Sequence, residues 1–231
     1  MPKINKPLKL DKIIPLKNPD KKLHETYYDG RNVADIPKPF VFVANGRPNS
    51  GKSLMTLHII AACQSGENPF DEIYIVHGAA NQTKEYEIVD PTDIFEEIPK
   101  YSDFDPEKNT LVIFDDVDYS KISKTDLKKI SELVRFGASN FNISQIYLNQ
   151  NFFRIPRVLR DNALNFIIFK PNDTDELSCI GRRIGIDKKT IKLLFREQLS
   201  HFRDSLFVDL KPGAPHKYYK NLFIVLDVPE D

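Results

Sequence analysis

FVFVANGRPNSGKSLMTLHII, residues 40–60, joins an apolar run to a helical pattern through a turn rich in glycine, asparagine, proline and serine. A loop of this kind ends a strand, turns its backbone N–H groups inward and aims the next helix at the same point. It is therefore predicted to cradle the phosphates of a nucleoside triphosphate. The loop matches the spacing G-x-x-x-x-G-K-[ST] as Gly46, Arg47, Pro48, Asn49, Ser50, Gly51, Lys52 and Ser53.

Two residues of this loop carry its predicted chemistry. The Lys52 side chain can reach the β- and γ-phosphates, and the Ser53 hydroxyl can occupy a position around Mg²⁺. So short a pattern also matches by chance, but here an apolar strand precedes it and a helical pattern follows it. We therefore expect ATP and Mg²⁺ to be the cofactors.

A second part of the site is predicted at TLVIFDD, residues 110–116, where an apolar run ends in two aspartates. Because the carboxyl ends of parallel strands lie along one edge of a sheet, Asp115 is expected near the phosphates, where it would bind Mg²⁺ directly or through water. Asp116 is expected to orient and polarise the attacking water. An acid directly after the magnesium aspartate favours hydrolysis over transfer to a second substrate.

The run ISQIYLNQ, residues 143–150, predicts another strand that ends beside the cradle. Gln150 is the predicted sensor of the γ-phosphate, because a neutral amide can donate and accept hydrogen bonds at once. An arginine that completes the site of a neighbouring subunit would neutralise charge in the transition state. Arg160 is the first candidate for that role, Arg157 the second, and Arg135 a further one.

Apolar strands alternate with amphipathic helices from residue 39 onward. Strands this apolar are buried on both faces, which indicates an α/β fold of the P-loop NTPase type with a mostly parallel, doubly wound sheet. A C-terminal helical segment and a β-hairpin at a sheet edge are expected after residue 170. The predicted strands are 39–44, 72–78, 110–116, 143–150, 165–170, 205–210 and 219–225, and the predicted helices are 52–64, 123–140, 174–185 and 187–202.

The N-terminal segment differs in composition from the rest of the chain. Residues 1–37 are rich in lysine and proline and show neither a helical nor a strand period. A basic extended arm and a disordered basic tail both fit this pattern. Residues 38–231 are predicted to form the ATPase domain.

Bulk composition narrows the classes of partner. Lys plus Arg and Asp plus Glu both number 33, so zero net charge offers no global indication of nucleic-acid or membrane binding. Local DNA contacts are instead expected in the basic arm or at Arg182 and Arg183. Cys63 and Cys179 fit no metal-binding spacing. No stretch reaches the ~18 apolar residues of a membrane span, so a soluble intracellular protein is expected.

Four stretches, taken in order, carry a resemblance to a known family. With them the chain resembles the viral genome-packaging ATPases of the FtsK–HerA superfamily, in particular the poxvirus-type group of large eukaryotic DNA viruses and virophage-like or polinton-like elements. The likeness covers most of the chain from residue 38. The stretches are GRPNSGKS (46–53), LVIFDDVD (111–118), LVRFGASNFNISQIYLNQNFF (133–153) and RDNALNFIIFKPNDTDEL (160–177).

The resemblance implies the same phosphate, magnesium, acid and sensor roles for Lys52, Ser53, Asp115, Asp116 and Gln150. It implies a sheet in which the sensor strand lies between the cradle strand and the magnesium-acid strand. It also implies a homo-oligomeric ring that threads double-stranded DNA, with capsid or portal-vertex proteins as partners. The expected location is the viral factory in the host cytoplasm, or the virion.

Two other functions remain open at this point. A nucleoside or nucleotide kinase would need an acceptor pocket and a mobile arginine-rich lid, and the chain contains no clear lid insertion. A non-catalytic assembly protein that only binds a nucleotide would not need Lys52, Asp115 and Asp116 together.

Overall fold

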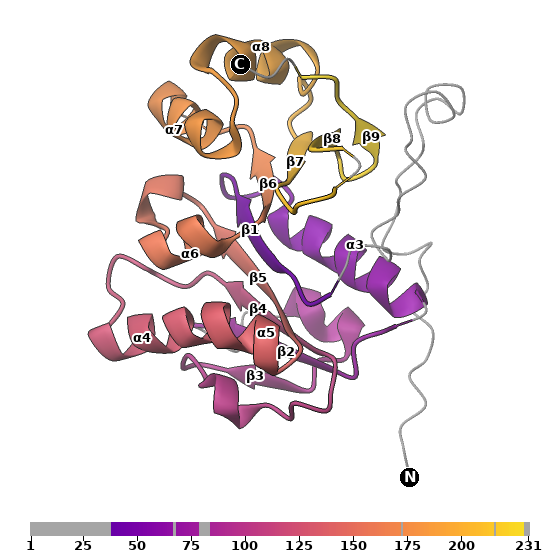
Figure 1. Cartoon of the computed structure of the whole chain (residues 1–231), viewed down its shortest axis with the longest axis vertical. Coiled ribbons are helices and arrows are strands. Elements are labelled where there is room, and N and C mark those ends of the chain that lie inside the picture. Colours follow the sequence, from indigo (N-terminus) through magenta and orange to yellow (C-terminus); the bar gives the residue numbers. More distant parts are fainter. Residues whose placement is uncertain (1–37, 67, 79–83, 172, 215, 229–231) are drawn as a thin grey trace.

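The computed structural model describes residues 38–66, 68–78, 84–171, 173–214 and 216–228. The predicted arm, residues 1–37, lies outside these ranges. Among the described residues, no helix combines the length and the apolar character needed to cross a membrane. Figure 1 shows a central sheet with helices packed on both of its faces.

The described strands form a nine-stranded sheet in the order β3-β2-β4-β5-β1-β6-β7-β8-β9. The six strands from β3 to β6 are parallel to one another, whereas β7, β8 and β9 each run antiparallel to their neighbours. The strands are β1 (Val41–Asn45), β2 (Glu72–His77), β3 (Asp93–Phe95), β4 (Thr110–Asp115), β5 (Ile143–Asn149), β6 (Asn165–Phe169), β7 (Ser205–Asp209), β8 (Tyr218–Lys220) and β9 (Ile224–Val225).

The helices cover the sheet from two sides, with α3 on one face and α4 and α6 on the other (Figure 1). This is the predicted doubly wound α/β arrangement. The helices are α3 (Lys52–Ser65), α4 (Lys124–Glu132), α5 (Ala138–Asn140), α6 (Arg157–Asn162), α7 (Thr174–Ile184) and α8 (Lys188–Glu197); short 3₁₀ turns are η3 (Lys84–Val89), η4 (Tyr101–Asp103) and η6 (Phe152–Arg154), and a π-helical turn is η5 (Leu133–Gly137).

Alternation along each central strand divides the core into two layers. In β4, Val112 and Phe114 face the layer beneath α4 and α6, while Leu111 and Ile113 face the layer beneath α3. All four side chains are buried, as expected for parallel strands that are covered on both faces. This double cover explains why the strands are apolar throughout rather than alternately polar.

The strand order confirms the predicted position of the sensor strand. β5 pairs with β1 on one side and with β4 on the other, in both cases in parallel. Asn45 at the end of β1 lies directly opposite Asn149 at the end of β5. The residues that follow β1, β4 and β5 therefore emerge at the same edge of the sheet.

Two predicted elements are interrupted in the structure. The helix expected over 123–140 does begin at the predicted cap, where the Ser123 hydroxyl accepts from the Asp126 N–H at 3.0 Å. It widens into the π-helical turn η5 over Leu133–Gly137, and the buried Gln145 side chain of β5 donates to the Leu133 carbonyl at 2.8 Å. A side chain from a neighbouring strand that binds a helix carbonyl favours such a widening.

The final predicted strand, 219–225, is also wrong as a single element. Asn221 and Leu222 have φ values of 52° and 74°, so the chain turns there and separates β8 from β9. The predicted hairpin is present as the antiparallel pair β7 and β8, with Leu206 opposite Lys220. β3 and α6 were not predicted at all, because both are short and neither has a clear period.

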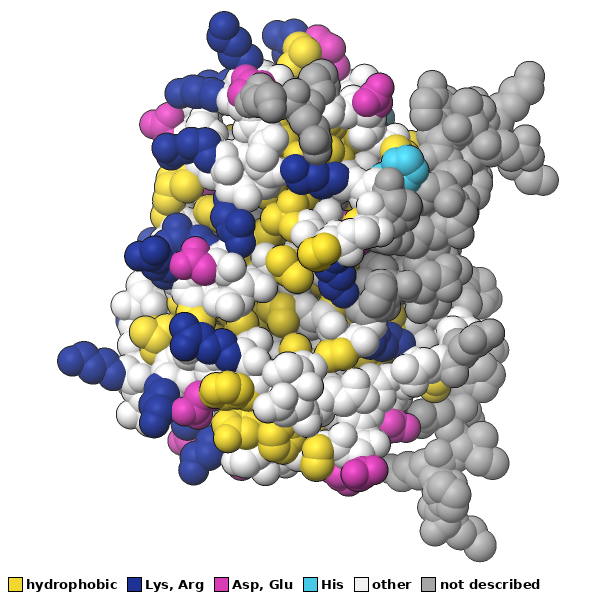
Figure 2. All heavy atoms as spheres, viewed as in Figure 1, with side chains coloured by type: hydrophobic (Ala, Val, Ile, Leu, Met, Phe, Trp, Pro, Cys, Tyr) yellow, Lys and Arg dark blue, Asp and Glu magenta, His cyan; other side chains and the backbone are white. Residues whose placement is uncertain are grey.

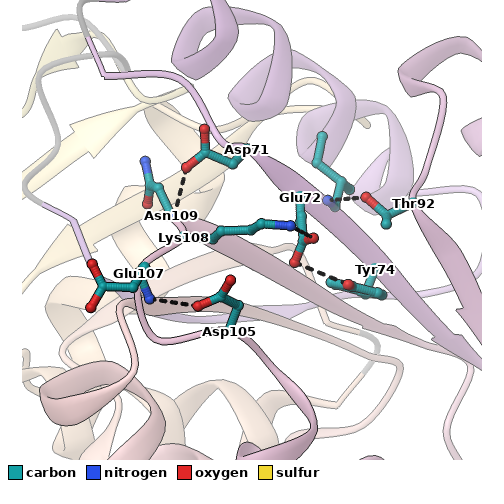
Figure 3. Close-up of polar contacts among 9 residues, drawn as sticks. Asp71, Glu72, Tyr74, Thr92, Asp105, Glu107, Lys108 and Asn109 are labelled. Atoms are coloured by element: carbon teal, nitrogen blue, oxygen red, sulfur yellow. Dashed lines mark hydrogen bonds and ion pairs between the residues drawn. The ribbon is translucent and has the colours of Figure 1, made fainter. Parts of the chain in front are cut away.

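Charged residues at the amino ends of β2 and β4 pair with one another, as Figure 3 shows. Lys108 forms an ion pair with Glu72, and the Tyr74 hydroxyl donates to the second oxygen of the same carboxylate at 3.0 Å. The Asn109 N–H donates to Asp71 at 2.8 Å. Burial and the neighbouring Glu72 raise the pKa of Tyr74 to about 12. This network links the segment that leads into β2 to the segment that leads into β4.

Candidate functional site

The loop between β1 and α3 is shaped by residues with unusual backbone angles. Asn49 and Gly51 have φ values of 62° and 106°, in the left-handed region that turns successive N–H groups toward one point. At Gly46, an added Cβ would lie 2.7 Å from both the Phe169 Cβ and the Ser50 Oγ, so no larger residue fits without displacing them. The loop conformation thus depends on its glycines.

Several groups in this loop lack partners that a bound anion would supply. α3 begins at Lys52 after Gly51, and no side chain within the described ranges caps the N–H groups of its first turn. The Ser50 hydroxyl is buried, with 2% of the residue exposed, and it makes no hydrogen bond to any residue that the structure describes. An uncapped helix N-terminus and a buried free hydroxyl both fit phosphate oxygens, so the cradle is suited to a nucleotide.

Lys52 lies folded against the loop itself. Its Nζ donates to the Gly46 carbonyl at 2.7 Å and to the Arg47 carbonyl at 2.9 Å. Burial lowers the pKa of Lys52, while the nearby Asp115 and Asp116 carboxylates partly oppose this shift. The half-buried ammonium is therefore held against the loop, within the field of both carboxylates.

Asp115 ends β4 and lies against the start of α3. The Ser53 hydroxyl is 3.4 Å from Asp115 Oδ2, and the Tyr86 hydroxyl donates to the same oxygen at 2.6 Å. Ser53 and Asp115 are hard oxygen donors on facing elements, which is the ligand type that Mg²⁺ prefers. The residues present therefore fit a magnesium ion shared with nucleotide phosphates. Tyr86 was not predicted, because KEYEIV shows no motif or period that singles it out.

Asp116 follows in a strained backbone conformation. Its φ is 54°, which is uncommon for a residue with a Cβ and frequent at functional sites. The Gln150 amide nitrogen lies 3.3 Å from Asp116 Oδ1, and both side chains are exposed. The structure thus brings the predicted acid and the predicted sensor into contact at the same edge of the sheet.

The cradle strand and the sensor strand are joined behind the site. The Gly46 N–H donates to the Asn149 carbonyl at 3.0 Å. The buried Glu176 of α7 accepts from the Asn45 side chain at 3.1 Å and from the Phe152 N–H at 2.6 Å through one carboxylate oxygen. Glu176 was not singled out from the sequence, because a helical glutamate normally faces solvent. It couples the end of β1 to the segment after Gln150.

The candidate arginines lie in different surroundings. The Arg160 guanidinium is 5.9 Å from the centre of the Phe152 ring, and its buried Nε has no hydrogen-bond partner in the described part of the chain. The Arg157 side chain is 86% exposed and pairs with Asp161 at 3.0 Å. Arg135 is exposed on η5.

The DNA contacts expected in the basic arm, residues 1–37, lie outside the described residues. Arg182 and Arg183, the other expected contacts, lie in different surroundings. Arg183 donates to the backbone carbonyls of Arg160 at 2.6 Å and Asp161 at 3.3 Å, and its guanidinium lies 5.6 Å from the Phe166 ring centre. It therefore packs α7 onto α6. Arg182 is exposed.

A strand, a phosphate-binding loop and a helix, followed by an acid at the tip of a nearby parallel strand, define the P-loop NTPase fold. The sheet order, with β5 between β1 and β4, is the one that the resemblance to the FtsK–HerA superfamily implied. The predicted fold class is therefore confirmed.

Solved structures of similar fold include viral genome-packaging ATPases, a conjugation coupling protein and the ATPases 2 and 3 of EssC. The chain is similar to B204, the DNA-packaging ATPase from Sulfolobus turreted icosahedral virus, with a TM-score of 0.57, 16% identity, and coverage of 79% of this chain and 97% of that one. B204 from Sulfolobus turreted icosahedral virus 2, a genome-packaging NTPase in complex with sulfate, matches with a TM-score of 0.57, 15% identity, and coverage of 84% and 100%.

A third similar structure is a conjugation coupling protein. The conjugation coupling protein TcpA of pCW3, solved with ATPγS, has a TM-score of 0.55 and 14% identity over 82% of this chain and 61% of that one. Neither a family model nor a curated protein matches the chain.

Proposed function

We propose that this chain is an ATP-hydrolysing motor that moves double-stranded DNA into a viral capsid. The observation that carries the proposal is the gathering of Lys52, Asp115, Asp116 and Gln150 at the carboxyl edge of one sheet. The solved packaging ATPases of similar fold support the same function.

Each residue at this edge has a distinct role in the proposed reaction. The loop 46–53 binds the triphosphate through backbone N–H groups, and Lys52 leaves the Gly46 and Arg47 carbonyls to contact the β- and γ-phosphates. Ser53 and Asp115 would hold Mg²⁺, which when bound neutralises charge on the phosphate oxygens. The ammonium of Lys52 adds positive charge at the transferred group.

Asp116 and Gln150 act on the attacking water in this proposal. The Asp116 carboxylate accepts a hydrogen bond from the water and orients it toward the γ-phosphate. The Gln150 amide contacts Asp116 at 3.3 Å. Loss of the γ-phosphate would therefore change the position of Gln150 at the end of β5. From β5 the signal passes through Phe152 and Glu176 to α7.

A ring of subunits would complete the site and surround the DNA. An arginine acting between subunits must reach outward, and exposure favours Arg157 over the first candidate, Arg160. In Figure 2, Lys and Arg side chains gather on the side of the molecule formed by α4, α6 and α7. The exposed basic residues there include Lys124, Lys128 and Arg182. We propose this side as the surface that meets DNA or the next subunit.

The wider setting follows from the resemblance to packaging ATPases. We propose capsid or portal-vertex proteins as partners, and the viral factory or the virion as the location. The kinase alternative is weaker, because Asp116 lies where a water activator is needed and not an acceptor substrate. The assembly-protein alternative is weaker, because the acid and the sensor are in contact.

One assay separates these functions. Phosphate release from ATP is measured with and without long duplex DNA, and in the presence of nucleoside or nucleotide acceptors. The motor proposal predicts hydrolysis that duplex DNA stimulates. ADP formed only with an acceptor would indicate a kinase, and nucleotide binding without turnover would indicate an assembly protein.

A further inference from the structure

The 3₁₀ turn η3 places a buried tyrosine against the magnesium-binding end of β4. Tyr86 is 0% exposed and packs in the apolar layer beneath α3, with Leu57, Ile60 and Ile113 in the same cluster. Its hydroxyl emerges from that layer and donates to Asp115 Oδ2 at 2.6 Å. Tyr86 thus reaches Asp115 from the buried layer beneath α3.

The hydroxyl of Tyr86 has no packing role of its own. A phenylalanine at this position would fill nearly the same volume, and burying a hydroxyl is unfavourable unless it forms a hydrogen bond. The hydroxyl donates a hydrogen bond to an ionisable carboxylate, and such a bond is stronger than one between neutral groups. The hydroxyl therefore contributes a hydrogen bond to Asp115.

The same carboxylate oxygen also faces the other magnesium candidate. Ser53 Oγ lies 3.4 Å from Asp115 Oδ2, so Tyr86 and Ser53 approach one oxygen from η3 and from α3. η3 itself packs against α3. A carboxylate torsion is soft in isolation, and a short hydrogen bond from a fully buried ring restricts it. Asp115 is thereby oriented before any ligand arrives.

We propose that Tyr86 is a positioning residue that holds the Asp115 carboxylate ready for Mg²⁺ and thereby sets the magnesium requirement of nucleotide binding. This inference rests on the proposed function, because it assumes that the cradle binds a nucleotide together with Mg²⁺. Groups that orient a metal ligand are commonly as important for metal affinity as the contacts they support.

The test compares wild type with Tyr86→Phe by fluorescence titration of an ATP analogue. Nucleotide affinity is measured over a range of Mg²⁺ concentrations and also in EDTA. Tyr86→Phe is expected to raise the Mg²⁺ concentration for half-maximal effect about tenfold, while the affinity in EDTA stays unchanged. A purely structural role would lower both affinities together or neither.

Tyr218→Phe is the matched control, because its buried hydroxyl donates to the Ile184 carbonyl at 2.8 Å, in the C-terminal part of the chain. Its magnesium requirement should equal that of wild type. Asp115→Asn supplies a second arm: in that background, Tyr86→Phe should have no further effect. This arm also stands if Tyr86→Phe lowers overall stability.

The outcomes separate the inference from the function on which it rests. If wild type binds the nucleotide in a Mg²⁺-dependent way and Tyr86→Phe has the same requirement, the inference fails and the proposed function stands. An equal effect of Tyr86→Phe with and without Asp115 would also overturn the inference. Wild type that shows no Mg²⁺-dependent binding would overturn both.

Discussion

The charged residues at the two edges of the parallel sheet differ in whether they pair with one another. At the amino edge, Lys108 and Glu72 pair with each other, and Tyr74 satisfies the second oxygen of the carboxylate. At the carboxyl edge, Lys52 donates to backbone carbonyls and forms no ion pair with Asp115 or Asp116, all three of which the structure describes.

This difference separates a structural polar cluster from a site prepared for a ligand. Charged groups that form an ion pair already have their partners. A lysine and two carboxylates that do not pair with each other can each contact part of a ligand. The strained Asp116 occurs at the carboxyl edge, together with the Ser50 hydroxyl, which has no hydrogen-bond partner among the described residues. Substitutions at the two edges should therefore have different consequences, catalytic at one and structural at the other.

The largest expected effect is at Lys52. Lys52→Ala should reduce ATP hydrolysis about 10³-fold, because the charge that stabilises the transferred phosphate is lost. Phosphate release under saturating ATP measures this. Lys108→Ala is the matched control at the other edge and should keep wild-type turnover with a small decrease in melting temperature. Equal losses of turnover in both variants would break the comparison.

Asp116→Asn is expected to reduce turnover about 10²-fold while ATP still binds. Asparagine tolerates the left-handed backbone at this position, so the φ of 54° can be kept and the loss assigned to the carboxylate. Nucleotide affinity and single-turnover hydrolysis are measured on the same sample. Normal hydrolysis by this variant would show that another group orients the water.

A smaller effect is expected at Gln150. Gln150→Ala removes a hydrogen bond to Asp116 that is long, at 3.3 Å, and exposed, so turnover should fall about tenfold. Nucleotide affinity should change little, since Lys52, Ser53 and Asp115 are retained. Steady-state rates with and without duplex DNA measure both the basal loss and any loss of coupling. An unchanged rate in both conditions would show that Gln150 has no role in hydrolysis or in its coupling to DNA.

The smallest effect on activity is expected at the amino edge. Glu72→Ala leaves the half-buried Tyr74 hydroxyl without its acceptor and should lower the free energy of unfolding by about 1 kcal/mol. Turnover at 25 °C should equal that of wild type. Denaturant unfolding gives the stability, and Tyr74→Phe in the same background should recover part of it. A catalytic defect in Glu72→Ala would show that the two edges are coupled.

Motif and period predicted most of what lies at the carboxyl edge. The P-loop spacing and the apolar runs ending in Asp115 and Gln150 made it possible to predict three strand tips converging, and β1, β4 and β5 are adjacent in the sheet. These features are local in sequence, because a strand and the residue that follows it determine which edge a side chain reaches.

The parts that could not be predicted depend on contacts between distant segments. Tyr86 meets Asp115 across 29 positions, and Glu176 meets Asn45 across 131, and neither pair belongs to a recognisable motif. The π-helical turn depends on Gln145, a residue of the following strand. A helical period cannot reveal a side chain that arrives from another element.

The most direct test of the central claim is a structure of the protein with Mg²⁺ and a non-hydrolysable ATP analogue. In that structure Lys52 Nζ is expected to leave the Gly46 and Arg47 carbonyls for the β- and γ-phosphates, with Mg²⁺ beside Ser53 and Asp115. A nucleotide bound away from the carboxyl edge, or a Lys52 still folded onto the loop with the triphosphate in place, would contradict it.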